Sequence, residues 1–221
     1  MEKINHKNWL ELANRVFAFP VIPAEALFVH GWGDLHEEIL HLVGQTCVRT
    51  KPRIIILNGE EAYEAGSQGF SYWQKFLVQK YKIDKQIIRK FLPGKHTLDE
   101  AKGFLKIAEE EKLNSAILIS VPPHIIRAFL TVLGEIQARI LDIALYPQTL
   151  KAVAWEEPVV ISGITSDAGD ENTTRLGRLV AECARIVQYR QRFQAGDNNF
   201  VIASVEEGLE YLQNLSKKRT L

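Results

Sequence analysis

Short apolar runs alternate with segments of helical periodicity along the first two thirds of this 221-residue chain. Uninterrupted apolar runs are typical of parallel strands that are covered on both faces, and the connections between these runs are too long for hairpins. The runs that we interpret as strands lie within Ala24–Asp34, Arg53–Leu57, Ile87–Phe91, Ser115–Val121 and Arg139–Leu145. The alternation predicts right-handed crossovers and an α/β fold, namely a Rossmann-like three-layer α/β/α architecture with a mostly parallel sheet.

Helical patterns fill the connections. The spacing of apolar residues predicts helices over Leu35–Arg49 and Ser71–Tyr81, and another helix that starts at His124. Thr97 and Glu100 have the Ser/Thr-x-x-Glu spacing of a capping box, which marks a helix start. This capping box accounts for both side chains without any ligand.

The pattern divides the chain into two parts. Residues 1–147 are predicted to form the Rossmann-like domain with an N-terminal helix, and residues 148–221 a helical C-terminal appendage on the same core. The helices expected in the appendage cover Thr173–Phe193 and Val205–Leu215. Ser204 and Glu207 form a second capping box. We expect the appendage to cover one edge or the mouth of the sheet.

The charges balance, because Lys+Arg and Asp+Glu both total 27. A net charge of zero provides no long-range field toward nucleic acids or anionic lipids, so neither is expected as a partner. Five arginines of the appendage are predicted to form a solvated helix face rather than a nucleic-acid stripe. They are Arg175, Arg178, Arg185, Arg190 and Arg192.

The two cysteines, Cys47 and Cys183, fall on apolar helix faces without Cys-x-x-Cys spacing, so we expect small core residues rather than a disulfide or a zinc site. The N-terminus has no apolar segment of signal-peptide length, and no apolar run reaches membrane-spanning length. A cytoplasmic protein without a membrane partner is therefore expected. The sequence leaves the oligomeric state open.

Ligands of parallel sheets bind at the carboxyl ends of the strands. The first strand ends in a Gly-x-Gly turn, in which Gly31 and Gly33 would let backbone N–H groups approach an anion. His30 and Trp32 flank the first glycine, and Trp32 would either stack on an adenine-like ring or cap the sheet edge. His36 stands where the dinucleotide fingerprint has its third glycine.

The second strand is followed by Asn58 and Gly59, which are a turn signal, and by Glu60. Nucleotide-binding folds commonly place an acidic residue against ribose hydroxyls at this point. Glu60 is therefore a candidate ligand-binding residue, and a solvated loop charge is the alternative.

Arg127 is the most telling candidate, because a cation in the first turn of a helix opposes the helix dipole. A bound phosphate or carboxylate, held by the helix N-terminus together with Arg127 and His124, would compensate for this repulsion. The alternative is a salt bridge to a nearby carboxylate or a solvated side chain. His124 is also a candidate general acid or base, because the ordinary pKa of histidine lies near neutrality.

Several chemistries have no motif in the chain. We find no His-Glu-x-x-His metal site, no Gly-x-Ser-x-Gly elbow and no Gly-Lys-Ser/Thr phosphate loop. No metal is therefore expected.

Four short motifs, in the same order along the chain, resemble the YdcF-like family of bacterial proteins, which includes SanA and ElyC. They are Val-His-Gly-Trp-Gly after the first strand, Leu-Asn-Gly-Glu after the second, Thr-x-x-Glu-Ala at a helix start and Pro-His-x-x-Arg-Ala after a later strand. The likeness covers about residues 20–147. It implies a Rossmann-like domain that binds a nucleotide- or S-adenosylmethionine-type ligand, and it raises Thr97 and Glu100 to candidate site residues.

The residues and the resemblance together predict a protein that binds an anionic, nucleotide-like ligand such as S-adenosylmethionine or a phosphorylated metabolite. His124 and Glu100 are the expected acid/base pair if the protein is an enzyme. The expected ligand-binding residues are His30, Gly31, Trp32, Gly33, Asn58, Gly59, Glu60, Thr97 and Arg127. The alternative is a non-catalytic ligand sensor or interaction module that uses its helical tail.

Overall fold

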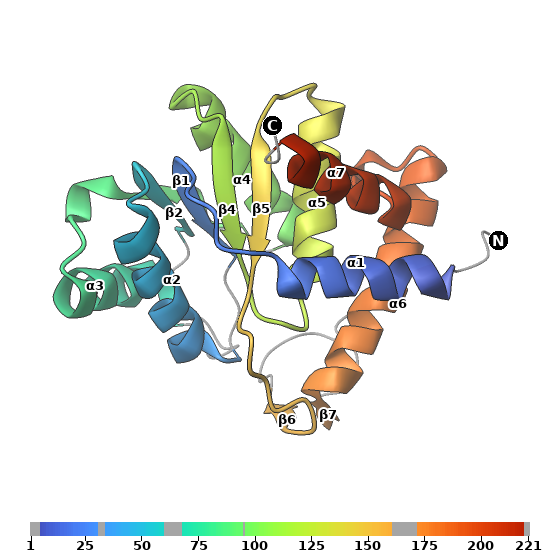
Figure 1. Cartoon of the computed structure of the whole chain (residues 1–221), viewed down its shortest axis with the longest axis horizontal. Coiled ribbons are helices and arrows are strands. Elements are labelled where there is room, and N and C mark those ends of the chain that lie inside the picture. Colours follow the sequence, from blue (N-terminus) through green and yellow to red (C-terminus); the bar gives the residue numbers. More distant parts are fainter. Residues whose placement is uncertain (1–4, 31–33, 60–67, 95, 161–171, 219–221) are drawn as a thin grey trace.

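The computed structural model, which describes residues 5–30, 34–59, 68–94, 96–160 and 172–218, is an α/β protein built on a five-stranded parallel sheet (Figure 1). The strands are β1 (Ala26–Val29), β2 (Ile54–Asn58), β3 (Ile88–Phe91), β4 (Ser115–Ile119) and β5 (Ala144–Gln148). Their order in the sheet is β3-β2-β1-β4-β5. The order reverses between β1 and β4, which makes this the topological switch point where such sheets bind ligands.

Helices cover both faces of the sheet and complete a Rossmann-like three-layer fold. On one face, α2 (His36–Thr50) and α3 (Gly69–Tyr81) pack against the side chains of Leu27 and Ile55. On the other face lie α1 (His6–Ala18), α4 (Thr97–Glu110) and α5 (Ile125–Ala138). Two 3₁₀ turns, Lys85–Ile87 and Asn198–Phe200, complete the described helical structure.

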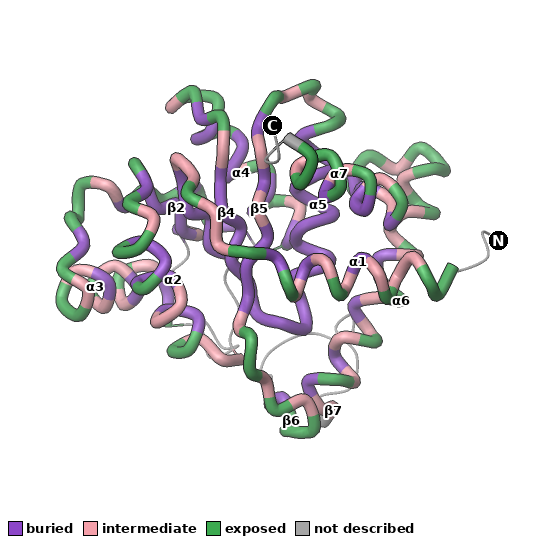
Figure 2. Tube along the Cα trace, in the orientation of Figure 1, coloured by how far each residue is buried: buried purple, intermediate pink, exposed green. Residues whose placement is uncertain are grey.

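The tail packs on the core of the rest of the chain. Its helices are α6 (Arg175–Gln194) and α7 (Val205–Lys218), and a small antiparallel pair, β6 (Pro158–Val160) and β7 (Asn172–Thr174), precedes them. Ile186, Ile202 and Leu212 join the hydrophobic cluster of α4 and α5. Because α6 and α7 lie beside α5, that helix is buried nearly all round (Figures 1 and 2).

The capping box of α7 and the start of β5 are both features that local sequence predicts. The capping box of α7 is confirmed, because the Glu207 backbone N–H donates to Ser204 Oγ over 3.1 Å and the Glu207 carboxylate accepts from the Ser204 N–H. The last strand was misplaced by prediction, since β5 begins at Ala144 rather than at position 139. Helix α5 continues to Ala138 and closes through Ile140, which adopts a left-handed φ of 56°. Pro147 lies inside β5, where an edge strand tolerates the missing N–H.

Within the described ranges, no helix combines the length and the apolar character that a membrane crossing requires.

Candidate functional site

His30 leaves the end of β1 at the switch point and is almost completely buried. Its backbone N–H donates to the Ile119 carbonyl oxygen over 2.8 Å, which ties the residue to the end of β4. Its Nε2 lies 2.9 Å from Glu100 Oε2, an ion-pair distance without the alignment of a hydrogen bond. Its Nδ1 has no hydrogen-bond partner among the described residues.

Glu100 is buried on α4 and is held from a second side by Asn58. The Asn58 side-chain amide donates to Glu100 Oε1 and to the Gly94 carbonyl oxygen, each over 2.8 Å, and accepts from the Gly94 N–H over 3.2 Å. Next to it, Gly59 packs so closely that a Cβ would collide with the Phe91 carbonyl oxygen. Asn58 therefore positions both the turn before α4 and the carboxylate that faces His30.

The predicted capping box at Thr97 and Glu100 is wrong. Helix α4 begins at Thr97, and its N-cap is His96, whose side chain makes no capping hydrogen bond. The Thr97 hydroxyl instead lies 3.4 Å from His124 Nε2, and the Glu100 carboxylate contacts Asn58 and His30. Partners distant in the sequence have replaced the local capping bonds, so both side chains belong to the site.

His124 stands at the N-terminus of α5 and is fully buried. Its Nδ1 lies 3.3 Å from Glu182 Oε2, and its ring centroid is 4.5 Å from that of His30. An ionised carboxylate can only accept hydrogen bonds, so Nδ1 carries the proton and Nε2 offers its lone pair to the Thr97 hydroxyl. Burial lowers the pKa of His124 well below its ordinary value, and Arg127 lowers the pKa further. The imidazole is therefore neutral at physiological pH.

Glu182, on α6, was not singled out by the sequence analysis, yet it lies at the centre of the cluster. The Glu182 side chain is 1 % exposed. Its carboxylate forms ion pairs with Arg127, with Arg178 Nε at 3.4 Å and with Arg185 Nη1 at 2.9 Å. Burial alone would raise the pKa of Glu182, but Arg127 and His124 outweigh it and hold the pKa well below the usual range. Burial lowers the pKa of Arg178 to about 10, which leaves its guanidinium charged at neutral pH.

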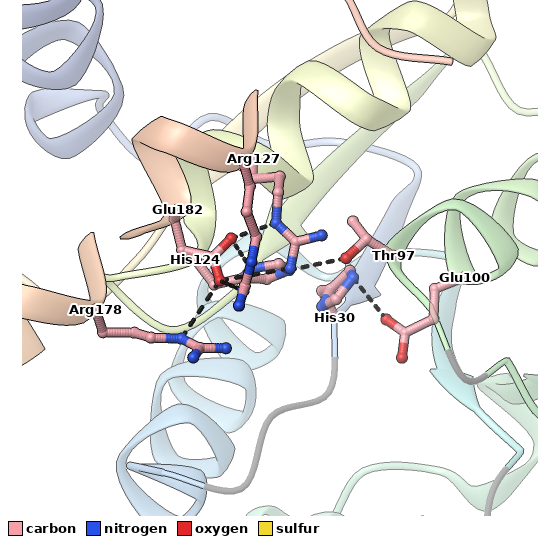
Figure 3. Close-up of polar contacts among 8 residues, drawn as sticks. His30, Thr97, Glu100, His124, Arg127, Arg178 and Glu182 are labelled. Atoms are coloured by element: carbon pink, nitrogen blue, oxygen red, sulfur yellow. Dashed lines mark hydrogen bonds and ion pairs between the residues drawn. The ribbon is translucent and has the colours of Figure 1, made fainter. Parts of the chain in front are cut away.

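These side chains form a continuous row (Figure 3). The row runs from Arg178 through Glu182 and His124 to His30 and Glu100, with Arg127 and Thr97 beside it. It brings together groups from β1, α4, α5 and α6. The tail thus supplies the carboxylate that orients His124.

The predicted solvated arginine face of α6 is wrong for its first half. Arg175 and Arg178 are buried, and Arg175 pairs with Asp34 over 3.0 Å and with Glu157. The apolar Leu176 and Val180 face outward instead, at 51 % and 62 % exposure. The pairing of Arg178 and Arg185 with Glu182 across one helical turn was the signal available in the sequence. It does not say by itself whether such a cluster faces solvent or the core.

Arg127 forms the salt bridge that was one alternative to an anion site, and its partner is the buried carboxylate of Glu182. Its guanidinium also lies over the Tyr189 ring, 5.7 Å from the centroid. Arg127 places a positive charge at the positive end of the α5 dipole, and the Glu182 carboxylate offsets this repulsion.

Four of the predicted ligand-binding residues, Gly31, Trp32, Gly33 and Glu60, lie outside the described residues. Across the part of the chain that the structure describes, no three His, Cys, Asp or Glu side chains gather as a metal site would require. Cys47 and Cys183 are free thiols. Burial raises the pKa of Cys47, and raises that of Cys183 to about 11. The raised pKa values favour the protonated thiol form of both residues at neutral pH.

No model of a known protein family matches this chain, and no curated protein matches its sequence.

The buried state of His124 predicts an acid-sensitive fold. Its pKa is about 6.5 in the unfolded chain and lower in the folded one, so below about pH 6.5 the unfolded chain binds a proton that the native state refuses. We expect the free energy of unfolding to decrease by up to about 1.4 kcal/mol per pH unit from this group. Urea denaturation at about pH 7.5, 6.5 and 5.5 measures the slope.

Two variants separate His124 from the other titrating groups. In His124→Gln the slope over this interval should flatten, because the titrating group is gone. His6→Gln, at an exposed position on α1, should keep the wild-type slope. Glu182 titrates below this interval because its pKa is depressed, so it does not mask the result. Equal slopes in His124→Gln and the wild type would contradict the expectation.

Proposed function

We propose that this protein binds an anionic, nucleotide-like small molecule at the carboxyl edge of its sheet and performs acid–base chemistry on it. The observation that carries the proposal is the pair of buried histidines at the switch point, each of which faces a buried glutamate. Burying these four ionisable groups costs desolvation free energy, whereas apolar side chains at the same positions would not incur this cost. Their convergence where α/β sheets bind ligands favours a functional role.

The two histidines are suited to different tasks. His124 is neutral and is oriented by Glu182, so its Nε2 can accept a proton. His30 Nε2 faces the Glu100 carboxylate, and its Nδ1 lacks a partner within the described structure. We assign to His30 Nδ1 a hydrogen bond to the bound ligand. Glu100 acts through His30 in this arrangement.

The surroundings favour a negatively charged ligand. Helices α4 and α5 both begin at the cluster, and the N-cap side chains His96 and His124 make no capping hydrogen bond to the first turns. Helix N-termini attract anions. Arg127, Arg178 and Arg185 add positive charge around Glu182. Nucleotides, sugar phosphates and S-adenosylmethionine all carry a phosphate or carboxylate that would suit these groups.

The motifs that resemble the YdcF-like family support the same site. The described residues of the four motifs meet in this cluster although they come from distant parts of the chain. Their polar side chains in the cluster are His30, Asn58, Thr97, Glu100, His124 and Arg127. We therefore propose that the resemblance reflects a shared ligand-binding edge.

Ligand-induced stabilisation tests the proposal. A nucleotide, a sugar phosphate or S-adenosylmethionine that binds only the folded state should stabilise the wild type by about 2.7 kcal/mol at 100-fold above its Kd. Arg185→Gln should weaken the effect, because this guanidinium belongs to the cluster and is partly accessible. Thermal denaturation with and without each compound, supported by calorimetry, measures it.

Arg192→Gln is the matched control, because Arg192 lies on the same helix but is half-exposed and pairs with Asp197 away from the cluster. It should respond to ligand as the wild type does. If no compound of the panel stabilises the wild type, or if Arg185→Gln responds as strongly as Arg192→Gln, the proposed binding site is wrong.

A further inference from the structure

We infer that Thr97 is a nucleophile, and that its hydroxyl attacks the phosphorus of a phosphate ester with His124 as general base and Glu182 as the positioning residue. The inference rests on the proposed function, because it assigns a substrate class to the same site. It adds a covalent step and a reacting atom. Neither follows from ligand binding or from acid–base chemistry alone.

Thr97, His124 and Glu182 lie next to one another in the order of a catalytic relay. Thr97 Oγ1 lies 3.4 Å from His124 Nε2, and His124 Nδ1 lies 3.3 Å from Glu182 Oε2. A hydroxyl, an imidazole and a carboxylate in this order form the relay by which enzymes activate weak nucleophiles, and such contacts are often somewhat long without substrate. Figure 3 shows Thr97, His124 and Glu182 in line across the site. All three side chains are buried.

The Thr97 side chain does not act as the N-cap of α4. A threonine at a helix start ordinarily caps the backbone, but Thr97 is the first residue of α4 rather than its N-cap, and its hydroxyl faces the imidazole. Its position on the first turn also brings the helix N-terminus next to the reacting oxygen. Negative charge that develops there would be stabilised by the helix dipole.

The charges near the relay indicate the class of substrate. Helices α4 and α5 begin at the relay, and the guanidinium groups of Arg127, Arg178 and Arg185 pair with Glu182 at one end of it, so that the positive charges there outnumber the carboxylate. A phosphoryl group carries negative charge on several oxygens in both the ground and transition states, which suits surroundings with an excess of positive charge. A neutral carboxylic ester develops a single negative charge and needs fewer positive groups. The cationic surroundings therefore point to a phosphate ester.

The proposed step balances without a further reactant. The Thr97 oxygen forms a bond to phosphorus while the bond from phosphorus to the leaving oxygen breaks. The Thr97 proton passes to His124 Nε2 and then to the leaving oxygen, which departs as an alcohol. In the second half, His124 Nε2 takes a proton from water, and the water oxygen forms a bond to phosphorus while the bond from phosphorus to Thr97 Oγ1 breaks. The proton on His124 then passes to Thr97 Oγ1 and restores the hydroxyl. The products are an alcohol and inorganic phosphate.

The first experiment determines which ring nitrogen of His124 carries the proton in the absence of substrate. A long-range ¹⁵N–¹H spectrum of the full chain distinguishes the two tautomers of neutral His124. We expect the proton on Nδ1, because Glu182 can only accept. A proton on Nε2 would overturn the inference, since His124 could not then take the Thr97 proton.

The second experiment traps the intermediate. The full chain is incubated with p-nitrophenyl phosphate, quenched in acid and analysed by intact and peptide mass spectrometry, while nitrophenolate release is followed in parallel. We expect one phosphoryl group on Thr97. Thr97→Ser keeps the hydroxyl and should retain the adduct. Thr97→Val keeps the branched shape without the hydroxyl, and it should lose the adduct and slow release by more than about 10³-fold. His124→Gln should slow release by about 10²–10⁴-fold.

The outcomes separate this inference from the proposed function. A wild type that is stabilised by phosphate ligands but forms no adduct with p-nitrophenyl phosphate or with a fluorophosphonate would overturn the role of Thr97 and leave the binding site standing. An adduct with p-nitrophenyl acetate in place of the phosphoryl adduct would overturn the substrate class. A wild type that no anionic ligand stabilises would instead count against the proposed function.

Discussion

Glu182→Gln should lower the free energy of unfolding by about 3–5 kcal/mol, the loss expected when one partner of a buried ion pair is removed. Among the described residues, Glu182 is the only carboxylate that contacts the Arg127 guanidinium, and Arg127 is itself buried. The amide would leave this charge in the interior without a counter-charge, and Arg178 and Arg185 would lose a partner. Chemical denaturation near pH 7.5 measures the loss.

The control is Glu206→Gln on α7, where the carboxylate is exposed and accepts only from the Asn8 side chain in the structure as described. It should change stability by no more than about 0.5 kcal/mol. Combining Glu182→Gln with Arg127→Gln should recover part of the loss, because the unpaired charge is removed with its partner. A Glu182→Gln variant that loses less than about 1 kcal/mol would show that the carboxylate does not hold the cluster together.

Phe28→Ala should cost about 3–5 kcal/mol, the usual range for removing a fully buried phenyl ring. Phe28 lies on β1 with no exposed surface, and its ring stacks on Phe104 with centroids 4.5 Å apart and planes 7° from parallel. The Phe91 ring and the His30 ring both contact Phe28 edge-on, each with its centroid 6.3 Å from the Phe28 centroid. The cavity would therefore open beneath the site as well as within the core.

Two measurements examine this prediction. Denaturant unfolding compares Phe28→Ala with Phe193→Ala, whose ring lies partly exposed near the end of α6 and should cost less than about 1.5 kcal/mol. Ligand-induced stabilisation should weaken in Phe28→Ala, since His30 loses the ring that packs against it. If both phenylalanines cost the same, the stacked pair does not dominate the packing between the sheet and α4.

Local patterns in the sequence were enough to predict the sheet and most of the helices. The apolar run Ile54–Leu57 and the helical spacing within α2 each depend on neighbouring residues, so they can be recognised without knowing the fold. The Ser204 capping box was predictable for the same reason, because both of its bonds join residues three positions apart. The end of α5 was not, since the left-handed turn at Ile140 left no clear signal.

The site required the tertiary structure. The sequence alone placed Thr97 and Glu100 at a helix start and His124 with Arg127 at another, and it made a parallel sheet the expected frame. It did not predict that Thr97 would contact His124, which is 27 residues away, or that Glu182 would reach Arg127 from 55 residues away. A carboxylate on an arginine-rich helix has the same local pattern in solvent as in the core. Only the packing of α6 against α5 removed water from Glu182, and that burial makes its charge part of the site.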